Sequence, residues 1–184
     1  GEEQTPTFEG YNAAQMAIAG AQAGTNAGTY KVQFTPDANH KWPDGSTEAK
    51  EVSWAIAPAA GSITLDKSSL ELRASLMSGV ITVTRPGDGA ITATSGNTSI
   101  ATVSVDGNEV TVTVKAKGSV NITVAVGAGA NYTAPQSKTV SVTVTLPTTV
   151  LNDNSWATIQ DVAASGNAAN YWSVGDTKNI TING

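Results

Sequence analysis

Valine alternates with threonine or serine along two neighbouring stretches of this chain, residues 100–105 and 109–115. Because successive side chains of a β-strand point to opposite faces, this period of two predicts two strands that are buried on one face only. The residues between them, Asp106-Gly107-Asn108, favour a tight turn, since glycine accepts the positive φ that such turns require. We therefore predict a β-hairpin in which Val112 is buried and Thr111 lies on the opposite face.

The hairpin lies inside a longer region, residues 61–147, that is predicted to form one complete all-β domain. Turn-forming residues separate short stretches of alternating or apolar sequence, as expected for an immunoglobulin-like Greek-key sandwich. The region lacks the cysteine pair and the central tryptophan that mark many such domains. The predicted strands are residues 62–65, 69–73, 79–84, 90–94, 100–105, 109–115, 119–126 and 138–146.

Residues 1–60 are predicted to form a smaller β-domain, a repeat that is incomplete at its N-terminus. Apolar and polar residues alternate clearly in 30–35 and 51–56, which predicts two strands. The connection between these strands contains Trp42 and is rich in the proline and glycine of turns. The stretch 13–18 is compatible with a short helical turn or an irregular strand, and we favour the strand.

The last segment, residues 148–184, is predicted to begin with the one convincing helix of the chain. Apolar residues recur there at helical spacing, with a polar cap before them and a glycine after them. The apolar residues are Trp156, Ile159, Val162 and Ala163, with Asn154 or Ser155 as the cap and Gly166 as the stop.

Two strands, residues 170–174 and 178–182, are predicted to follow the helix, so that this segment is the start of a further module. An unpaired strand exposes amide and carbonyl groups and recruits partners. The apolar helix residues also offer more surface than a free tail can leave in water. We therefore expect the segment to dock on the sandwich or to exchange between copies, which would allow self-association through it.

Composition narrows the class of partner. The 184 residues carry 10 Lys plus Arg against 15 Asp plus Glu, and this net charge of −5 disfavours nucleic acid as a partner. Cysteine is absent, so neither disulfides nor thiolate metal sites can stabilise the fold. No apolar stretch reaches the roughly 20 residues that a membrane helix needs, so we expect no membrane insertion. The low charge content and the abundance of small and hydroxyl residues are typical of β-proteins that work outside the cell.

The sequence offers little that could perform chemistry. His40 is the only histidine and no Gly-x-Ser-x-Gly motif accompanies it, so we predict no catalytic residue. Acidic residues near Trp42 could form a glycosidase pair beside a sugar-stacking ring, but solvated turns explain them more simply. These residues are Asp37, Asp44, Glu48 and Glu51.

Metal and ligand sites are equally sparse. Asn152-Asp153-Asn154 has part of a calcium-loop pattern without the spaced acids and the distal glutamate, so we expect helix capping there, and no metal or cofactor. Among the four tryptophans, Trp54 alternates with apolar residues, and Trp156 and Trp172 are predicted to be packing residues. Trp42 is therefore the one candidate platform for a ligand such as a glycan.

The central region carries an ordered set of short motifs. They are Ile63-Thr-Leu65 with Leu70-Glu-Leu72, then Gly79-Val-Ile-Thr-Val83, Ser99-Ile-Ala-Thr-Val-Ser-Val105, Val110-Thr-Val-Thr-Val114 and Gly118-Ser-Val-Asn-Ile-Thr-Val124. In this order they resemble the bacterial immunoglobulin-like domains of group 2, which also occur in intimin-type adhesins and phage virion proteins. That family often has Gly-Thr-Ala-Thr-Ile where this chain has Gly118-Ser-Val-Asn-Ile122, a conservative change for packing.

The flanking segments carry resemblances of their own. Residues 27–36 are followed by Asn39-His-Lys-Trp42, by Asp44-Gly45 and by Val52-Ser-Trp-Ala-Ile56. This order resembles short repeats of the adhesin-array type in large bacterial surface proteins, which have an additional first strand and more often an aromatic residue where His40 stands. The C-terminal segment resembles the opening of a domain of phage-related proteins from Gram-positive gut bacteria.

The residues and these resemblances together imply a non-enzymatic structural spacer and display module. It would belong to a modular, adhesin-like bacterial cell-surface protein or to a phage virion protein, and would lie outside the cell. Its partners would be the neighbouring domains of the same protein and a host-surface glycan or protein. The alternative is a carbohydrate- or receptor-binding module, which needs an exposed aromatic side chain beside convergent polar groups.

Overall fold

The structure, a computed structural model, describes residues 2–180. The chain divides into two compact units. The first contains the residues up to Gly61 together with the loops Gly87–Gly89 and Ala128–Ala134. The second contains Ser62–Pro86, Ala90–Gly127 and the chain from Pro135 onward.

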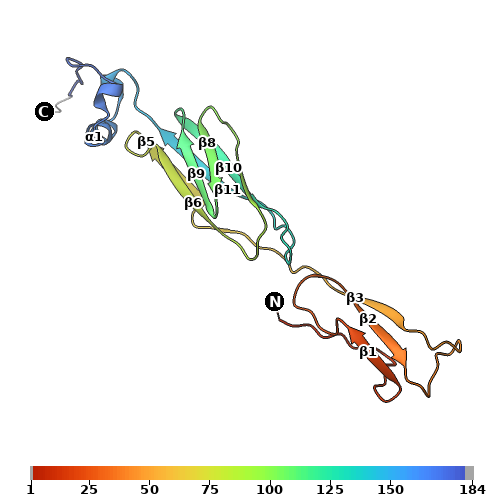
Figure 1. The fold of residues 1–184 in the computed structure, drawn as a ribbon. Helices are drawn as coiled ribbons and strands as arrows, with labels where there is room; N and C mark the ends of the chain where they lie inside the picture. Colours follow the sequence, from red (N-terminus) through yellow and green to blue (C-terminus); the bar gives the residue numbers. More distant parts are fainter. Residues whose placement is uncertain (1, 181–184) are drawn as a thin grey trace. The chain divides into compact units, whose positions relative to one another are not determined.

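The second unit contains an immunoglobulin-like sandwich of two four-stranded sheets (Figure 1). One sheet has the strand order β5-β11-β10-β7, with β5 Ser69–Arg73, β11 Lys138–Thr145, β10 Gly118–Val126 and β7 Ile91–Ser95. The other has the order β4-β6-β9-β8, with β4 Thr64–Leu65, β6 Ser78–Thr84, β9 Glu109–Val114 and β8 Ala101–Asp106. All eight predicted strands form, although β4 is shorter than predicted, and the predicted fold class is confirmed.

The core of the sandwich is built from the inward positions of these alternating strands. In β9 the side chains of Val110 and Val112 are fully buried, whereas Thr111 is half-buried and Thr113 is exposed. The prediction that Val112 lies in the core is therefore confirmed. The same alternation fills the core from the other strands, through Leu72, Ile81, Val83, Val120, Ile122, Val124, Val140, Val142 and Val144. Each such side chain contributes about 1.5–3 kcal/mol through its burial.

The hairpin between β8 and β9 closes as predicted, with a turn set by one glycine. Asp106 pairs with Glu109, which leaves Gly107 and Asn108 as a two-residue turn. Gly107 has a φ of +55°, and no other residue type in the described chain has a positive φ. A turn with positive φ only at its first central position suits the right-handed twist of a hairpin, and glycine adopts that conformation without steric cost.

The first unit is a three-stranded antiparallel sheet. Its strands β1 Met16–Gly20, β2 Gly28–Pro36 and β3 Lys50–Ile56 lie in the order β1-β2-β3. The strand favoured for residues 13–18 forms only from Met16 onward, because residues 13–15 are a turn. Tyr30 pairs with Trp54, and their rings stack with centroids 4.6 Å apart. Since side chains alternate along each strand, the apolar residues of all three strands share one face of this sheet.

The segment before β1 covers part of that apolar face. Phe8 and Tyr11 contact the ring of Phe34, with centroids 5.2 and 5.5 Å away. The segment is held to the rest of the unit by one pair of backbone hydrogen bonds, between Gln4 and Gly24. The cover leaves Val52 43% exposed, whereas Phe34 is buried beneath the two rings.

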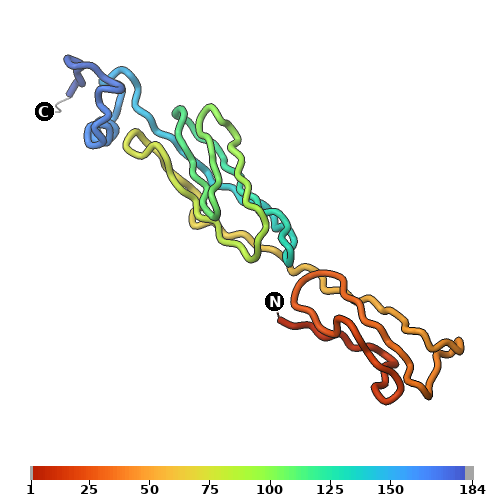
Figure 2. Tube along the Cα trace, viewed as in Figure 1, coloured from red at the N-terminus to blue at the C-terminus, as the bar shows by residue number. Residues whose placement is uncertain are grey.

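After β11 the chain forms η1 Leu151–Asp153, α1 Trp156–Ala164 and η2 Ala168–Asn170, which can be followed toward the blue end in Figure 2. Of the two proposed caps, Ser155 is the N-cap and its side chain accepts a hydrogen bond from the Thr158 N–H. Gly166, the predicted stop of the helix, follows it with a φ of +72°, the left-handed conformation in which glycine commonly ends helices. Neither this helix nor any other in the described chain is long and apolar enough to span a membrane.

The strand predicted at residues 170–174 is wrong, because this stretch continues from η2 into turns. Residues 178–180 are not in a strand either, and the rest of the second predicted strand, 181–182, lies outside the described residues. Aromatic and β-branched residues favour strands, but a strand needs a neighbour to accept its hydrogen bonds. Here the Trp172 indole instead donates to the Thr148 carbonyl, which holds the stretch against the beginning of the segment.

The prediction that Trp156 packs in a core is also wrong, since this side chain is 57% exposed. The buried residue of α1 is Val162. Six residues at about 100° each place Val162 roughly 120° from Trp156 around the helix, so the two do not share a face. Ala163, which lies nearly above Trp156 on the helix, is exposed as well.

Candidate functional site

Trp42, the candidate ligand platform, lies in the connection between β2 and β3. Its indole N–H donates to the Glu48 carbonyl at 2.8 Å, and its backbone N–H donates to the Ser46 carbonyl. The Lys50 ammonium lies 5.1 Å from the ring centroid. The side chain is half-buried. Trp42 is thus held in place by its polar edge and contacted by a cation at its ring.

Asp44 organises the same connection. Its carboxylate accepts hydrogen bonds from the Ser46 N–H and hydroxyl, at 2.9 and 2.6 Å, and pairs with the Lys50 ammonium at 2.6 Å. These contacts, first the one to Lys50 and then those to Ser46, hold the pKa of Asp44 well below its usual range. A carboxylate that is already paired and strongly acidic is a poor general acid. Its role here is to fix the turn that presents Trp42.

His40 and Asp37 form a separate contact within their own tight turn. His40 Nδ1 lies 2.6 Å from an Asp37 carboxylate oxygen, which also accepts the Asn39 N–H at 2.8 Å. The hydrogen bond to His40 is the main cause of the lowered pKa of Asp37, and the Asn39 N–H adds to it. Asp37 thus stabilises a turn, as a local side-chain acceptor does.

The acids near Trp42 do not converge on a common point. Glu51 pairs with Lys31 at 2.6 Å, and both residues occupy positions on the polar face of the sheet, opposite the aromatic face. Glu48 meets Trp42 through its backbone carbonyl. The geometry therefore gives no support to the glycosidase pair that was weighed against turn formation.

A hollow of about 410 Å³ lies beside Trp42 on the apolar face of the first unit. Trp42 lines it together with Phe8, Tyr11, Met16 and Phe34. Sequence reasoning identified Trp42 and the strand that contains Phe34 but missed Phe8 and Tyr11. The only signal for them is the spacing of two aromatic residues in an otherwise polar stretch, and it says nothing of the strand that they cover.

Asn152-Asp153-Asn154 contributes to packing. Asn154 is the buried polar side chain of the described chain, 6% exposed, and its amide donates to the carbonyls of Thr148 and Val150 while its oxygen accepts the Thr148 N–H. Both the amide nitrogen and the amide oxygen of the side chain thus have partners within the segment. Across residues 2–180, no three His, Cys, Asp or Glu side chains are placed to hold a metal ion.

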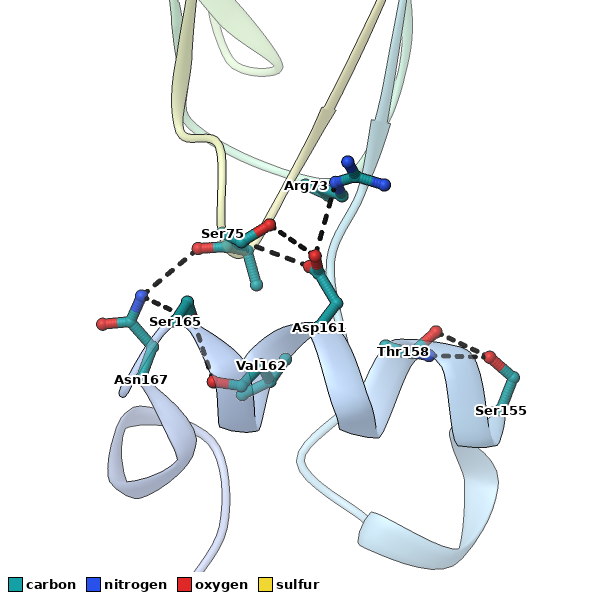
Figure 3. A network of polar contacts seen from close by, with 9 residues as sticks. Arg73, Ser75, Ser155, Thr158, Asp161, Val162, Ser165 and Asn167 are labelled. Atoms are coloured by element: carbon teal, nitrogen blue, oxygen red, sulfur yellow. Dashed lines mark hydrogen bonds and ion pairs between the residues drawn. The ribbon is translucent and has the colours of Figure 1, made fainter.

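The C-terminal helix docks on one end of the sandwich, at the turn that joins β5 to β6 (Figure 3). The Asp161 carboxylate accepts hydrogen bonds from the Ser75 hydroxyl and from the Ser75 N–H, and it pairs with Arg73 Nε at 3.3 Å. The Asn167 amide donates to the Ala74 carbonyl at 3.3 Å. The turn itself is closed by two backbone hydrogen bonds between Arg73 and Leu76. This segment was expected either to dock on the sandwich or to exchange between copies. In the structure it docks on the sandwich of the same chain.

Comparison with known proteins gives only remote similarities. No family model matches the chain, and no curated protein matches it. Domains 4–9 of the surface-layer protein SbsC are 23% identical over 68% of this chain, with a TM-score of 0.38, and this chain spans 19% of their length. Domains 4 and 5 of SbsC are 18% identical over 77% of this chain and 78% of theirs, with a TM-score of 0.39. The D00-D0 domain of intimin is 14% identical over 76% of this chain and 77% of its own length, with a TM-score of 0.29.

Proposed function

We propose that this chain is a structural spacer and display module that works outside the cell, as part of a modular bacterial surface protein or a phage virion protein. Its task is then to hold neighbouring modules of the same protein at a distance. It performs this task without enzymatic chemistry. Three features support the proposal: the direction of two strands, the polarity of the outer faces and the absence of cysteine.

The observation that carries the proposal is the pairing of β5 with β11. These are respectively near the beginning and at the end of the sandwich, and they pair in parallel, Ser69 with Ser141 through to Arg73 with Thr145. Tension that enters the chain before β5 and leaves it after β11 pulls the two strands in opposite directions along their length. The hydrogen bonds between them are then loaded together, in shear, and none can open first. A sandwich connected in this way resists stretching.

The outer faces of the sandwich suit a spacer. The strand residues that point away from the core are mostly threonine and serine, for example Thr113, Thr123, Ser141 and Thr143, all of them exposed. Hydroxyl side chains of this kind hydrogen-bond to water and keep a β-surface wettable. Because the chain has no cysteine, the fold depends on its core alone and is independent of the redox conditions outside the cell.

Stretching single molecules tests the proposal directly. With the whole chain held by its ends, we expect the sandwich to unfold at a higher force than the three-stranded first unit. The gain in chain length, about 3.3–3.6 Å for each residue released, identifies which unit has unfolded. A sandwich that unfolds at the same force as the first unit, or below it, would contradict the spacer function.

A second function, a carbohydrate- or receptor-binding module, is favoured by one observation. Trp42 is half-buried and lines the aromatic hollow of about 410 Å³, where a sugar face could stack. The Asp44–Lys50 pair beside it supplies polar groups. Screening the chain against a glycan array, with Trp42→Ala as the comparison, tests it. Binding that disappears in this variant supports the second function, and an array without signal above background rejects it for glycans.

A further inference from the structure

Strand β1 forms a free edge of the first unit's sheet. The backbone hydrogen bonds from Asp37 N–H to the Gln15 carbonyl and from Ala21 N–H to the Lys31 carbonyl fix which residues face β2. Odd-numbered residues of β1 direct their N–H and carbonyl groups toward β2, so the groups of Ile18, midway along the strand, point outward. The register therefore leaves the Ile18 N–H and carbonyl without a partner in β2.

Apart from Met16, whose outward N–H donates to the Asn12 carbonyl at 3.1 Å, this edge lacks the features that protect edge strands from pairing with other chains. Natural edges are blocked by charges, proline, bulges or shortness. The sequence of β1, Met16-Ala-Ile-Ala-Gly20, contains no charge and no proline, and its five residues pair with β2 in unbroken register. Its alanine side chains, on the polar face of the sheet, are exposed and small.

The other sheet edges of the described chain differ from β1. Charged residues lie in β3, β5 and β8, and β4 has only two residues. Strand β7 is uncharged but packs against β8 of the opposite sheet. An extended strand that meets this chain thus finds its most open template at β1.

We propose that β1 is a lateral contact through which two copies of this chain pair, antiparallel, edge to edge. A twofold axis at Ile18 makes the strand its own complement, since Ile18 of each copy exchanges N–H and carbonyl bonds with Ile18 of the other. The Gly20 N–H of each copy then meets the Met16 carbonyl of the other. In this register Ala17 of one copy lies directly opposite Ala19 of the other, and the two sheets become one of six strands.

The pairing is weak by itself. A contact along five residues buries less than the roughly 1,200 Å² of stable complexes, so association occurs only at high concentration or when many copies are held side by side on a surface. Pairing through β1 would align neighbouring copies side by side, in addition to the proposed spacer function. The two are tested separately, since the force on a single molecule does not depend on pairing between copies.

Sedimentation velocity from micromolar to millimolar concentration tests the pairing. We expect the unaltered chain to associate as the concentration rises. A17K/A19K should remain monomeric, because it sets lysines of the two copies opposite each other. A17K/A19E carries the same number of substitutions but sets lysine opposite glutamate, and should associate at least as well as the unaltered chain. Ala55→Lys, at an alanine on β3 that is also exposed, serves as the control for added charge and should leave association unchanged.

Disulfide formation gives an independent test, because the chain has no cysteine of its own. An equimolar mixture of Ala17→Cys and Ala19→Cys should cross-link faster than either variant alone, since residue 17 faces residue 19 of the other copy at a close, non-hydrogen-bonded pair. A chain that stays monomeric at millimolar concentration overturns the proposal. So does association that A17K/A19K does not weaken, or that both double variants lose equally.

Discussion

At the scale of single residues, Val110 and Val112 of β9 are fully buried in the core of the sandwich. Val112 is fully buried and faces Gly79 on one neighbouring strand and Val103 on the other. Val112→Asp places a charge in this core with no partner, and we expect it to lower the free energy of unfolding by more than about 4 kcal/mol.

Thr113→Lys is the matched control, because Thr113 is the next residue and points into solvent. Its effect should lie within about 0.5 kcal/mol. Chemical denaturation followed by circular dichroism measures both. Thr111 is a less suitable control, since it is half-buried. Comparable destabilisation by the two changes would mean that the two faces of β9 are not distinguished by burial.

Asp44 gives a prediction about pH. Its pKa is lowered mainly by the hydrogen bond to the Lys50 ammonium, and next by Ser46. The folded state therefore favours the carboxylate, and its contribution to stability is present above the ordinary aspartate pKa of about 3.9 and is lost as the pH falls through the lowered value. Lys50→Ala should raise the pKa of Asp44 toward its ordinary value by more than Ser46→Ala does.

Titration of the Asp44 carboxyl carbon by NMR measures this order. The ammonium contributes a charge as well as a hydrogen bond, whereas the hydroxyl contributes only a hydrogen bond. An Asp44 pKa that moves more in Ser46→Ala than in Lys50→Ala would show that the turn, and not the ion pair, holds the carboxylate.

At the scale of elements, the junction between α1 and the β5–β6 turn decides whether the C-terminal segment is part of the second unit. Asp161 is its centre, with three bonds to Ser75 and Arg73 (Figure 3). Its carboxylate is mostly shielded from solvent, whereas Arg73 is well exposed, so the serine contacts should contribute more than the ion pair.

We expect Asp161→Ala and Ser75→Ala each to weaken docking of α1, and the double variant to cost less than the sum. The coupling should be about 1.5–3 kcal/mol, the range of a hydrogen bond to a charged group. Hydrogen exchange of the α1 amides measures the free energy of opening for each variant. Gln160→Ala, an exposed neighbour on the same helix, should leave the exchange unchanged. A coupling near zero would mean that other contacts hold the helix.

Features that depend on residues close together in the sequence could be predicted, whereas contacts between residues far apart could not. The strands of the sandwich were predicted almost residue by residue, because alternation is a local property. The pairing of β5 with β11, the contact of Phe8 with Phe34 and the contact of Asp161 with Ser75 join residues far apart in the chain. No local pattern marks them. The same limit explains the wrong strand at 170–174, since strand-forming residues do not reveal whether a partner strand exists.

The candidate site was predicted only in part. Trp42 was correctly placed in a turn-rich connection. Of its acidic neighbours, Asp37 and Asp44 stabilise turns as predicted, whereas Glu51 lies in β3 and pairs with Lys31. The residues that share its hollow, Phe8 and Tyr11, were missed because they come from a different segment. Trp156 was assigned to a core from helical spacing, which shows the residues that share a face but not which face meets the rest of the protein.

At the scale of the whole molecule, the central claim is that the sandwich is connected to bear tension. Each feature that supports the spacer function also fits a passive β-domain, except the parallel pairing of β5 with β11. That pairing makes the strength of the sandwich depend on the direction of the pull. A sandwich selected to resist stretching should be strongest when it is pulled from the start of β5 and the end of β11.

Two attachment geometries on the same strands measure this dependence. Cysteines introduced in pairs give unique handles in a chain without cysteine, and the exposed positions Ser69, Ser141 and Thr145 accept them. Pulling between residues 69 and 145, at opposite ends of the pair, loads the β5–β11 hydrogen bonds in shear. Pulling between residues 69 and 141, which lie side by side, opens them one after another. The account predicts a markedly higher unfolding force for 69 with 145; equal forces, or a higher force for 69 with 141, would contradict it.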